Sequence, residues 1–427
     1  MDLNPASDWL PHDRQHCWHP YTQHGLDPEP LPVVAAEGSW LQLADGRRLL
    51  DAISSWWTVL HGHGQPELIS AMTEQAKTLD HVLFAGCTHE PAARLAAELT
   101  NLAPGELSRA FFSDDGSTAV EVALKAAYQF HLREGRDRRT TFLALNGGYH
   151  GDTFGAMAAG DPDPFFQEFS PLLFRVLRID PTLEALHEAL KAHSDQIAAF
   201  LFEPMVQGAA GMVMIPPEFY SEAEKLCRER GILTIADEVM TGFGRTGTLF
   251  ACDQANLNPD LMCLAKGLTG GIFPLSVTLV KEEVFQAFWS RERSRAFFHG
   301  HSFTAHPVGC AVARASLALN LRNQTPKVLT AIGKKIHHSL RAWVESEEAV
   351  TLRHLGGIVA LEFQASDPGY LSGLGQHLRQ YCRNSSALLR PLGPVLYAMP
   401  PAATSLSEAE QIAKAMMEVG DGALAKI

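Results

Sequence analysis

The sequence predicts an α/β protein: a large, mostly parallel sheet covered by helices, and a smaller α+β domain formed by both ends of the chain. Between about residues 65 and 320, continuously apolar strand-like runs alternate with amphipathic helical stretches, which is typical of parallel strands buried on both faces. The flanks instead contain short strands around a turn at 44–47 and hairpin-like strands after a long helix. We therefore expect an N-terminal segment at 1–60 that joins the small domain, a large domain at 61–324 and a C-terminal small domain at 325–427.

The elements of the central region follow one another in a regular order. The expected helices and strands are a helix at 66–79, a helix at 90–102, a strand at 109–113, a helix at 117–132, strands at 141–145 and 197–202, a helix at 217–230, and strands ending at Asp237 and Ala265. Ligands of open parallel sheets collect at the carboxyl ends of the strands. Distinctive motifs follow these strand ends, at 113–117, 146–152, 203–211, 237–247 and 266–271. This coincidence predicts a ligand site at one edge of the sheet.

Composition excludes several classes of protein. The 427 residues are 46% hydrophobic and 19% charged, which is ordinary for a globular chain, and the net charge of −13 argues against nucleic-acid binding. The seven cysteines are scattered without a CxxC pair, so neither a disulfide framework nor a zinc ribbon is indicated. The N-terminus has no signal-peptide pattern and no apolar run is long enough to span a membrane. We expect a cytoplasmic protein.

The most informative residues are a carboxylate and an amine at the ends of successive apolar strands. One strand ends on Asp237, and the next ends on Lys266, which runs into Gly267-Leu-Thr-Gly-Gly271. Pyridoxal-phosphate chemistry needs a lysine that bonds to the cofactor aldehyde and an aspartate that pairs with the protonated ring nitrogen. A surface cation and a strand-end cap are the ordinary explanations for such residues taken singly. Their joint placement favours a pyridoxal-phosphate site.

Two glycine-containing motifs suit other parts of such a cofactor. Gly116 and Ser117 follow a strand and open a helix, whose first amides can receive a phosphate, although a plain helix cap has the same pattern. Tyr149 lies in a glycine-rich turn and offers an aromatic face for a flat ring. The His61-Gly-His63 and His299-Gly-His301 pairs lack the spacing and carboxylates of a metal site, so no metal is predicted.

The tryptophan pair Trp56-Trp57 is unusual for a polar stretch. Paired tryptophans are more often core than ligand wall. Adjacent side chains on an extended segment point in opposite directions. If the segment is extended, one indole is expected in the core and the other on a pocket.

Over nearly its whole length the chain resembles the class III, fold-type I aminotransferases. The general motifs of that family are present at 114–125, 148–152, 203–204, 235–247 and 266–271, and narrower ones at 18–22, 54–57 and 390–401. The resemblance implies the fold-type I architecture of pyridoxal-phosphate-dependent transferases. It also implies a homodimer with active sites at the subunit interface, with neither nucleic acid nor membrane as a partner.

The resemblance assigns roles to residues of this sequence. The catalytic residues would be Lys266, Asp237 and Tyr149. Cofactor binding would use Gly116, Ser117, Tyr149, His150, Asp237 and Lys266, with His301 and Ser302 reaching the phosphate from the neighbouring subunit. Many relatives carry Pro-Thr at the last two positions; Ser302 keeps the hydroxyl and His301 departs from the pattern. The substrate pocket would contain Tyr21, Trp56, Trp57, Asp152, Arg245, Gly300, Arg390 and Tyr397.

The narrower motifs imply a particular reaction. It is the amination of 8-amino-7-oxononanoate to 7,8-diaminononanoate in biotin biosynthesis, with S-adenosyl-L-methionine as amino donor. Both substrates carry a carboxylate, which Arg390 is suited to bind, and aromatic faces such as those of Tyr21 or Tyr149 suit a sulfonium. Ornithine- and 4-aminobutyrate-type relatives carry a glutamate that masks this arginine, whereas this chain has Ala209 there.

Three alternatives stay open. The chain could catalyse another class III reaction, such as ω-amino acid:pyruvate transamination. It could take lysine as donor for the same step. It could also bind the cofactor as a regulator without turnover, although no DNA-binding helix pair or basic arm accompanies the domain.

Overall fold

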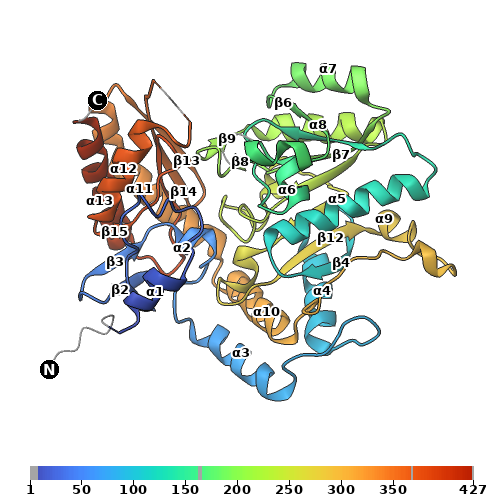
Figure 1. The fold of residues 1–427 in the computed structure, drawn as a ribbon, viewed down its shortest axis with the longest axis horizontal. Helices are drawn as coiled ribbons and strands as arrows, with labels where there is room; N and C mark the ends of the chain where they lie inside the picture. Colours follow the sequence, from blue (N-terminus) through green and yellow to red (C-terminus); the bar gives the residue numbers. More distant parts are fainter. Residues whose placement is uncertain (1–7, 162–165, 367–368, 426–427) are drawn as a thin grey trace.

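The computed structural model describes residues 8–161, 166–366 and 369–425. Its largest element is a seven-stranded sheet with the strand order β4-β12-β11-β10-β7-β5-β6 (Figure 1). The strands are β4 (Leu107–Ser113), β12 (Ser276–Lys281), β11 (Leu261–Leu264), β10 (Leu233–Asp237), β7 (Ile197–Phe202), β5 (Thr141–Leu145) and β6 (Val176–Ile179). All neighbours pair in parallel except β12, which is antiparallel to both β11 and β4. The predicted α/β fold class with a mostly parallel sheet is confirmed.

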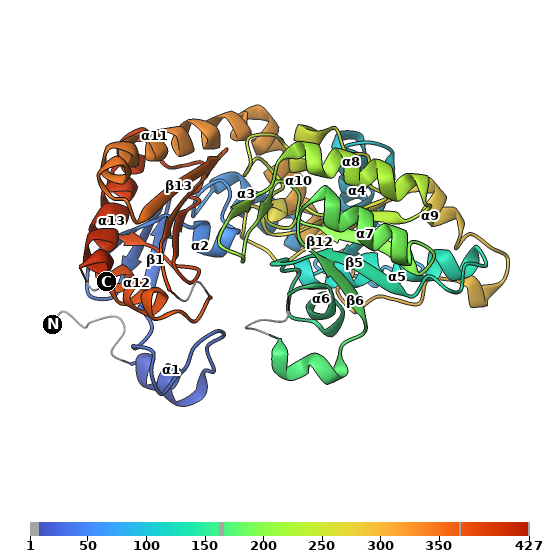
Figure 2. The same cartoon turned by 90° about the horizontal axis from the view of Figure 1, so that it is seen from above.

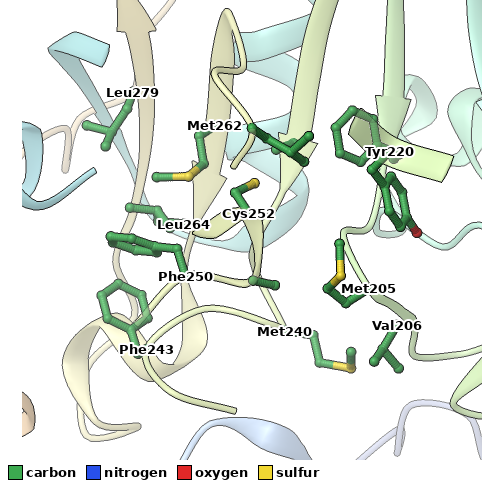
Figure 3. Close-up of a cluster of buried hydrophobic side chains, with 14 of the residues drawn as sticks. Met205, Val206, Tyr220, Met240, Phe243, Phe250, Cys252, Met262, Leu264 and Leu279 are labelled. Carbon is green, nitrogen blue, oxygen red and sulfur yellow. The ribbon is translucent and has the colours of Figure 1, made fainter. Parts of the chain in front are cut away.

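Helices cover both faces of this sheet because its strands are apolar on both sides. Ile235, Leu261 and Cys263 pack with the apolar face of α5. Met262 and Leu264 point the other way, into a second cluster with Phe243, Phe250 and Met240 (Figure 3). The helices of this part are α3 (Pro66–Thr78), α4 (Glu90–Leu102), α5 (Gly116–Arg133), α6 (Phe154–Ala159), α7 (Leu183–His193), α8 (Pro217–Glu229), α9 (Glu282–Gln286) and α10 (Pro307–Arg322).

Short elements connect the strands and helices of the large sheet. They are the two-stranded ribbon β8 (Val206–Gln207) and β9 (Val213–Met214) and the 3-10 turns η1 (Gln167–Leu172), η2 (Ala251–Ala255), η3 (Lys266–Thr269) and η4 (Arg293–Arg295).

Both ends of the chain form the second, smaller body. The strands β1 (Val33–Glu37), β2 (Trp40–Leu43) and β3 (Arg48–Asp51) form a sheet that β15 (Ala387–Leu388) extends by parallel pairing with β3. Beside it lie a three-stranded sheet of β13 (Val350–Leu355), β14 (Ile358–Phe363) and β16 (Val395–Ala398), and the helices α11 (Thr325–Ser346), α12 (Gly373–Arg383) and α13 (Leu406–Leu424). Figures 1 and 2 show the blue N-terminal strands against the red C-terminal helices.

The N-terminal helix α1 (Leu10–His16) lies outside these sheets. The domain boundaries after residues 60 and 324 stay predictions. Over the three described stretches of chain, no helix is both long and apolar enough to cross a membrane.

Candidate active site

A cavity of about 370 Å³ lies where the carboxyl ends of β4, β5, β7, β10 and β11 meet the N-terminal and C-terminal segments. The structure brings most of the predicted site residues to its wall. They are Tyr21, Trp56, Trp57, Gly116, Ser117, Tyr149, His150, Asp237 and Lys266. Met240 also lines it, so the apolar cluster that Figure 3 shows extends to the cavity wall.

Lys266 stands at the start of η3, directly after β11 ends. Its φ of +47° is left-handed, a conformation that side-chain-bearing residues adopt at a cost and that clusters at functional sites. The Nζ atom lies 4.4 Å from the centroid of the Trp57 ring. Burial lowers the pKa of the Lys266 amine to about 8, although Asp237 and Glu203 act in the opposite direction. A buried amine with this pKa is a nucleophile near neutral pH.

Because its pKa is lowered, the reactivity of Lys266 toward the cofactor should depend on pH in the neutral range. Only the neutral amine attacks an aldehyde, and its fraction rises from roughly a tenth at pH 7 to roughly nine tenths at pH 9 when the pKa is about 8. We expect the rate at which the cofactor-free protein bonds to added pyridoxal phosphate to rise with a midpoint near pH 8. Stopped-flow absorbance measures that rate. A midpoint near 10 would show that burial does not act on this amine.

Asp237 ends β10 and is almost fully buried. The Nδ1–H of His150 donates to its Oδ2 at 2.7 Å, and the backbone amide of Val239 donates to its Oδ1 at 3.0 Å. A carboxylate can accept about four hydrogen bonds, so room remains for a protonated ring nitrogen in the cavity. His150 therefore touches the aspartate, and its Nε2 is buried without a hydrogen-bond partner in the described chain.

Glu203 is a site residue to which the sequence analysis gave no role. It follows β7 and is buried on the cavity wall, where Oε1 accepts from the Tyr149 amide at 3.1 Å and Oε2 from the Gly208 amide at 2.9 Å. Burial raises the pKa of this carboxyl to about 7, with Asp237 adding to the rise and His150 opposing it. Its position at a strand end is the same signal that singled out Asp237.

The helix α5 begins at the edge of the cavity. Asp115 caps it by accepting from the Thr118 amide at 2.8 Å, which leaves the first-turn amides of Gly116 and Ser117 without intrahelical acceptors. A Cβ on Gly116 would lie 2.6 Å from Val239 Cγ1, so only glycine fits this approach. The Ser117 hydroxyl accepts from the Asp152 amide at 3.0 Å. This end suits an anion such as a phosphate.

Tyr21, Tyr149 and Asp152 form a hydrogen-bonded group at the mouth. Both phenols donate to the Asp152 carboxylate, Tyr21 at 2.5 Å and Tyr149 at 3.0 Å, and the two phenol oxygens are 3.0 Å apart. Burial raises the pKa of both phenols, so they stay protonated as donors. The Tyr149 ring stacks on Phe166. Two aromatic rings are thus held in place around the opening.

The tryptophan pair lies on a left-handed turn, so the expectation of an extended segment was wrong. All four residues of α2 (Ser54–Trp57) have positive φ, from 44° to 72°. Such a turn costs roughly 1–2 kcal/mol per residue. Trp57 is in the core and Trp56 is half-buried, yet both line the cavity.

Two charged side chains hold this turn. At one end, the buried Asp51 accepts from the Ser55 amide at 2.8 Å, the Ser55 hydroxyl at 2.7 Å and His63 Nε2 at 2.8 Å. At the other, Arg245 donates to the Trp57 and Val59 carbonyls at 3.1 and 3.3 Å, and also contacts the Ser54 hydroxyl and the Pro400 carbonyl.

The placement of Arg245 corrects the prediction that it lines the substrate pocket. Its side chain is 1% exposed, is absent from the cavity wall, and burial lowers its pKa to about 10. The arginine is turned toward backbone carbonyls because the left-handed turn leaves them without partners. Arg245 therefore affects the site indirectly, because it holds the turn that carries Trp56 and Trp57.

We expect Asp51→Asn to destabilise the protein and the turn. The amide keeps the size of the side chain but loses the charge that receives the hydrogen bonds of Ser55 and His63. The free energy of unfolding should fall by about 1.5–3 kcal/mol, the usual worth of hydrogen bonds to a charged group. Urea denaturation measures it. Asp45→Asn, at an exposed turn, is the matched control and should change little.

Arg390 and Tyr397 also lie off the cavity wall. The Arg390 guanidinium lies 4.6 Å from the Trp56 ring centroid and lines an adjoining hollow that Tyr21 and Trp56 share. Within the described residues it makes no ion pair. Tyr397 is fully buried and its hydroxyl accepts from Trp57 Nε1 at 2.8 Å, so it supports the tryptophan and does not line the pocket as expected.

Gly300, His301 and Ser302 lie apart from the cavity of their own chain. His301 Nε2 is 3.7 Å from Asp114 Oδ1, and Ser302 is exposed. Their role toward a neighbouring subunit stays a prediction. Across the residues described, no group of three or more histidine, cysteine, aspartate or glutamate side chains is arranged to hold a metal ion.

Comparison with known proteins agrees with this geometry. The family model for class-III aminotransferases matches residues 21–419. An adenosylmethionine-8-amino-7-oxononanoate aminotransferase of Synechococcus elongatus is 44% identical, covering 95% of this chain and 98% of the relative. The crystal structure of the protein of that name from Methanocaldococcus jannaschii has a TM-score of 0.91 at 33% identity, covering 96% of this chain and 98% of its own.

A second solved structure comes from the wider group. An amine transaminase from an uncultivated Pseudomonas species, in its PLP-bound form, has a TM-score of 0.89 at 30% identity, covering 96% of this chain and 98% of its own. The lysine, carboxylate and helix N-terminus around the cavity fit the aldehyde, ring nitrogen and phosphate of pyridoxal phosphate. The chain belongs to the class-III aminotransferases and is a pyridoxal-phosphate-dependent enzyme.

Proposed function

We propose that this enzyme transfers the amino group of S-adenosyl-L-methionine to 8-amino-7-oxononanoate and forms 7,8-diaminononanoate, a step of biotin biosynthesis in the cytoplasm. The names of its curated relatives support the reaction. The observation that carries it within this chain is the Arg390 guanidinium over Trp56, without a carboxylate partner in the described residues. That cation is available for the carboxylate that both substrates carry.

The loop after β7 supports the same assignment. Ala209 lies on the cavity wall, at the position where ornithine- and 4-aminobutyrate-type relatives carry the glutamate that pairs with the corresponding arginine. With alanine there, the arginine keeps its charge for substrate. The indole of Trp56 beneath it suits the apolar chain of a long keto acid.

The residues around the cavity have separate roles in transamination. Bound pyridoxal phosphate supplies an electron sink for the bond that breaks at the substrate Cα. Asp237, oriented by His150, holds a positive charge at the ring nitrogen. Lys266 would hold the aldehyde of the cofactor, and its free amine would accept the proton that leaves the substrate Cα. Trp57 and Met240 exclude water from the amine.

We propose a homodimer, in which His301 and Ser302 reach the phosphate site of the neighbouring subunit. Exposed apolar side chains near this segment support the interface: Phe303 is 56% exposed and touches the His81 ring, and Leu83 is 57% exposed. Light scattering should give the mass of two chains. A Ser302→Ala variant should weaken cofactor retention while remaining dimeric.

We expect Arg390→Met to raise the KM for 8-amino-7-oxononanoate by about 10- to 100-fold, since it removes a bidentate charged contact. The effect on kcat should be smaller because Arg390 is off the reacting atoms. Steady-state kinetics measure both values. Arg94→Met, at an exposed i,i+4 pair on α4, is the control. An unchanged KM would mean that another group binds the carboxylate.

The amino donor is tested by the half-reaction alone. The holoenzyme is mixed separately with S-adenosylmethionine, lysine, β-alanine or ornithine, and the cofactor spectrum is followed to the pyridoxamine form. Conversion by S-adenosylmethionine alone supports the proposal. Conversion by lysine alone means the lysine-donor version, and conversion by β-alanine means an ω-aminotransferase.

A further inference from the structure

The His61-Gly-His63 motif lies between two turns that contribute to the cavity wall. Its histidines flank a glycine with a φ of +101°, and their rings reach different partners. His63 bonds to Asp51, which holds the left-handed turn at 54–57. His61 lies against the second turn, at 266–271, which carries the proposed catalytic amine and is called the lysine turn below. The mechanism described above gives His61 no part.

Two side chains connect this motif to the lysine turn. His61 Nε2 lies 3.0 Å from the Ser316 hydroxyl on α10, and that hydroxyl donates to the Gly267 carbonyl at 3.3 Å. A carbonyl only accepts, so the single hydroxyl proton points to Gly267 and the serine oxygen accepts from the Nε2–H of the histidine. The same carbonyl accepts the Gly270 amide at 3.0 Å. The His61–Ser316 pair therefore ends on the carbonyl that closes the lysine turn.

Burial determines the state of the His61–Ser316 pair. Both side chains are buried in the described protein. Burial lowers the pKa of the His61 imidazole to about 4, although the contact with Ser316 opposes the fall, so the ring is neutral at pH 7 and has one N–H to donate. Packing adds to the hydrogen bonds, because a Cβ on Gly270 would lie 3.1 Å from His61 Cδ2. The imidazole therefore lies directly on the lysine turn.

The lysine turn needs such contacts because its backbone is strained. Lys266 has a φ of +47°, and Gly270 and Gly271 follow at +65° and +89°. A residue with a side chain keeps this conformation only where its surroundings hold it there. Relaxation of the Lys266 backbone would move the amine from its place 4.4 Å from the centroid of the Trp57 ring. Contacts that hold the turn therefore also hold the amine.

We propose that His61 and Ser316 are positioning residues for Lys266. Neither is among the described residues that line the cavity, so the pair acts through the backbone of the lysine turn and not on the substrate. It keeps the amine directed into the cavity. The inference rests on the proposed role of Lys266 and does not depend on which amine is the donor.

Ser316→Ala removes the hydroxyl that donates to Gly267. We expect the rate at which the cofactor-free protein bonds to added pyridoxal phosphate to fall about tenfold at every pH, because a small misplacement of a reacting group costs this much or more. Stopped-flow absorbance measures the rate, and its midpoint near pH 8 should stay, since the amine remains buried. His61→Phe keeps a ring but no N–H, and should lower the rate less, because the serine still reaches the carbonyl.

The double variant His61→Phe/Ser316→Ala separates positioning from stability. Ser316→Ala alone leaves a buried imidazole N–H without its acceptor, whereas the double variant removes both polar partners, which is nearly neutral for stability. We expect the thermal midpoint to fall in Ser316→Ala and to recover in the double variant, while the bonding rate stays about tenfold low in both. Recovery of the rate together with the stability would mean that the pair only supports the fold. A wild-type rate in Ser316→Ala would equally overturn the inference.

Two further measurements test for general damage. Ser221→Ala is the matched control: its hydroxyl on α8 donates to the Ala255 carbonyl of η2, and the bonding rate should not change. Calorimetry should give the same affinity for pyridoxal phosphate in Lys266→Ala and in Lys266→Ala/Ser316→Ala, because the pair acts only through the lysine; a loss of affinity in the second would contradict this. If the wild-type protein never shows the spectrum of the lysine-bound form, the proposed role of Lys266 fails and this inference fails with it.

Discussion

Replacing Lys266 with alanine should reduce turnover by more than about 10⁴-fold. The amine is expected to perform two tasks, covalent attachment of the cofactor and proton transfer at the substrate Cα, and proton transfer alone contributes about 10²–10⁴-fold. Among the described side chains that line the cavity, Lys266 is the only one with an amine, so no described neighbour can replace it. The variant should still bind pyridoxal phosphate through Asp237 and the start of α5, but without the spectrum of the lysine-bound form.

The assay is steady-state formation of 7,8-diaminononanoate, with absorbance spectra of the purified variant. Lys225→Ala is the control, because this lysine is exposed on α8 and, within the described residues, forms an ion pair with Glu222 alone. Turnover by Lys266→Ala within tenfold of wild type would exclude Lys266 as the amine of the reaction.

Asp237→Asn should lower the rate of the half-reaction by about 10²–10³-fold, the usual effect of removing one preorganised electrostatic group. A neutral amide does not stabilise a positive charge on the ring nitrogen, so the electron sink weakens. The single carbonyl oxygen of asparagine can still accept from His150 or from the Val239 amide, but not from both in the present arrangement, so a modest loss of stability should accompany the loss of rate.

Stopped-flow absorbance measures the half-reaction, and thermal denaturation of the cofactor-free protein checks the fold. Asp45→Asn is again the control: it makes the same carboxylate-to-amide exchange at an exposed turn and should change neither the rate nor the stability. Half-reaction rates equal to wild type would mean that Asp237 does not face the ring nitrogen. A large loss of thermal stability in Asp237→Asn, with a normal half-reaction rate in the protein that remains folded, would mean that Asp237 has only a structural role.

The large sheet could be predicted because its signal is local. Continuous apolar runs such as those ending at Asp237 and Lys266 identify parallel strands, and parallel topology brings their carboxyl ends to one edge. The cavity wall therefore contains Asp237 and Lys266, the two residues expected at the ends of these strands. The same rule placed the motif at 203–211 at this edge, but it did not assign a role to Glu203 within that motif.

The left-handed turn could not be predicted in this way. Its four positive φ angles are held by hydrogen bonds to the nearby Asp51 and to Arg245, which is 188 residues from Trp57 in the sequence. Residue preferences at Ser54–Trp57 do not favour this conformation. Tertiary hydrogen bonds therefore override local propensity.

Arg245 and Tyr397 illustrate a second limit. Both were expected on the substrate pocket, and both instead lie behind it, in contact with the tryptophan turn. A sequence motif indicates that a residue belongs to a site. It does not show whether the side chain lines the pocket or holds a residue that lines it. Only burial and hydrogen-bond partners make that distinction.

The most direct test of the account is product formation from both proposed substrates. Purified holoenzyme is incubated with S-adenosylmethionine and 8-amino-7-oxononanoate, and products are identified by mass spectrometry, with Lys266→Ala in parallel. The account predicts 7,8-diaminononanoate from the wild-type enzyme and none above background from the variant. Transamination of other amines without any 7,8-diaminononanoate, from any donor, would contradict it.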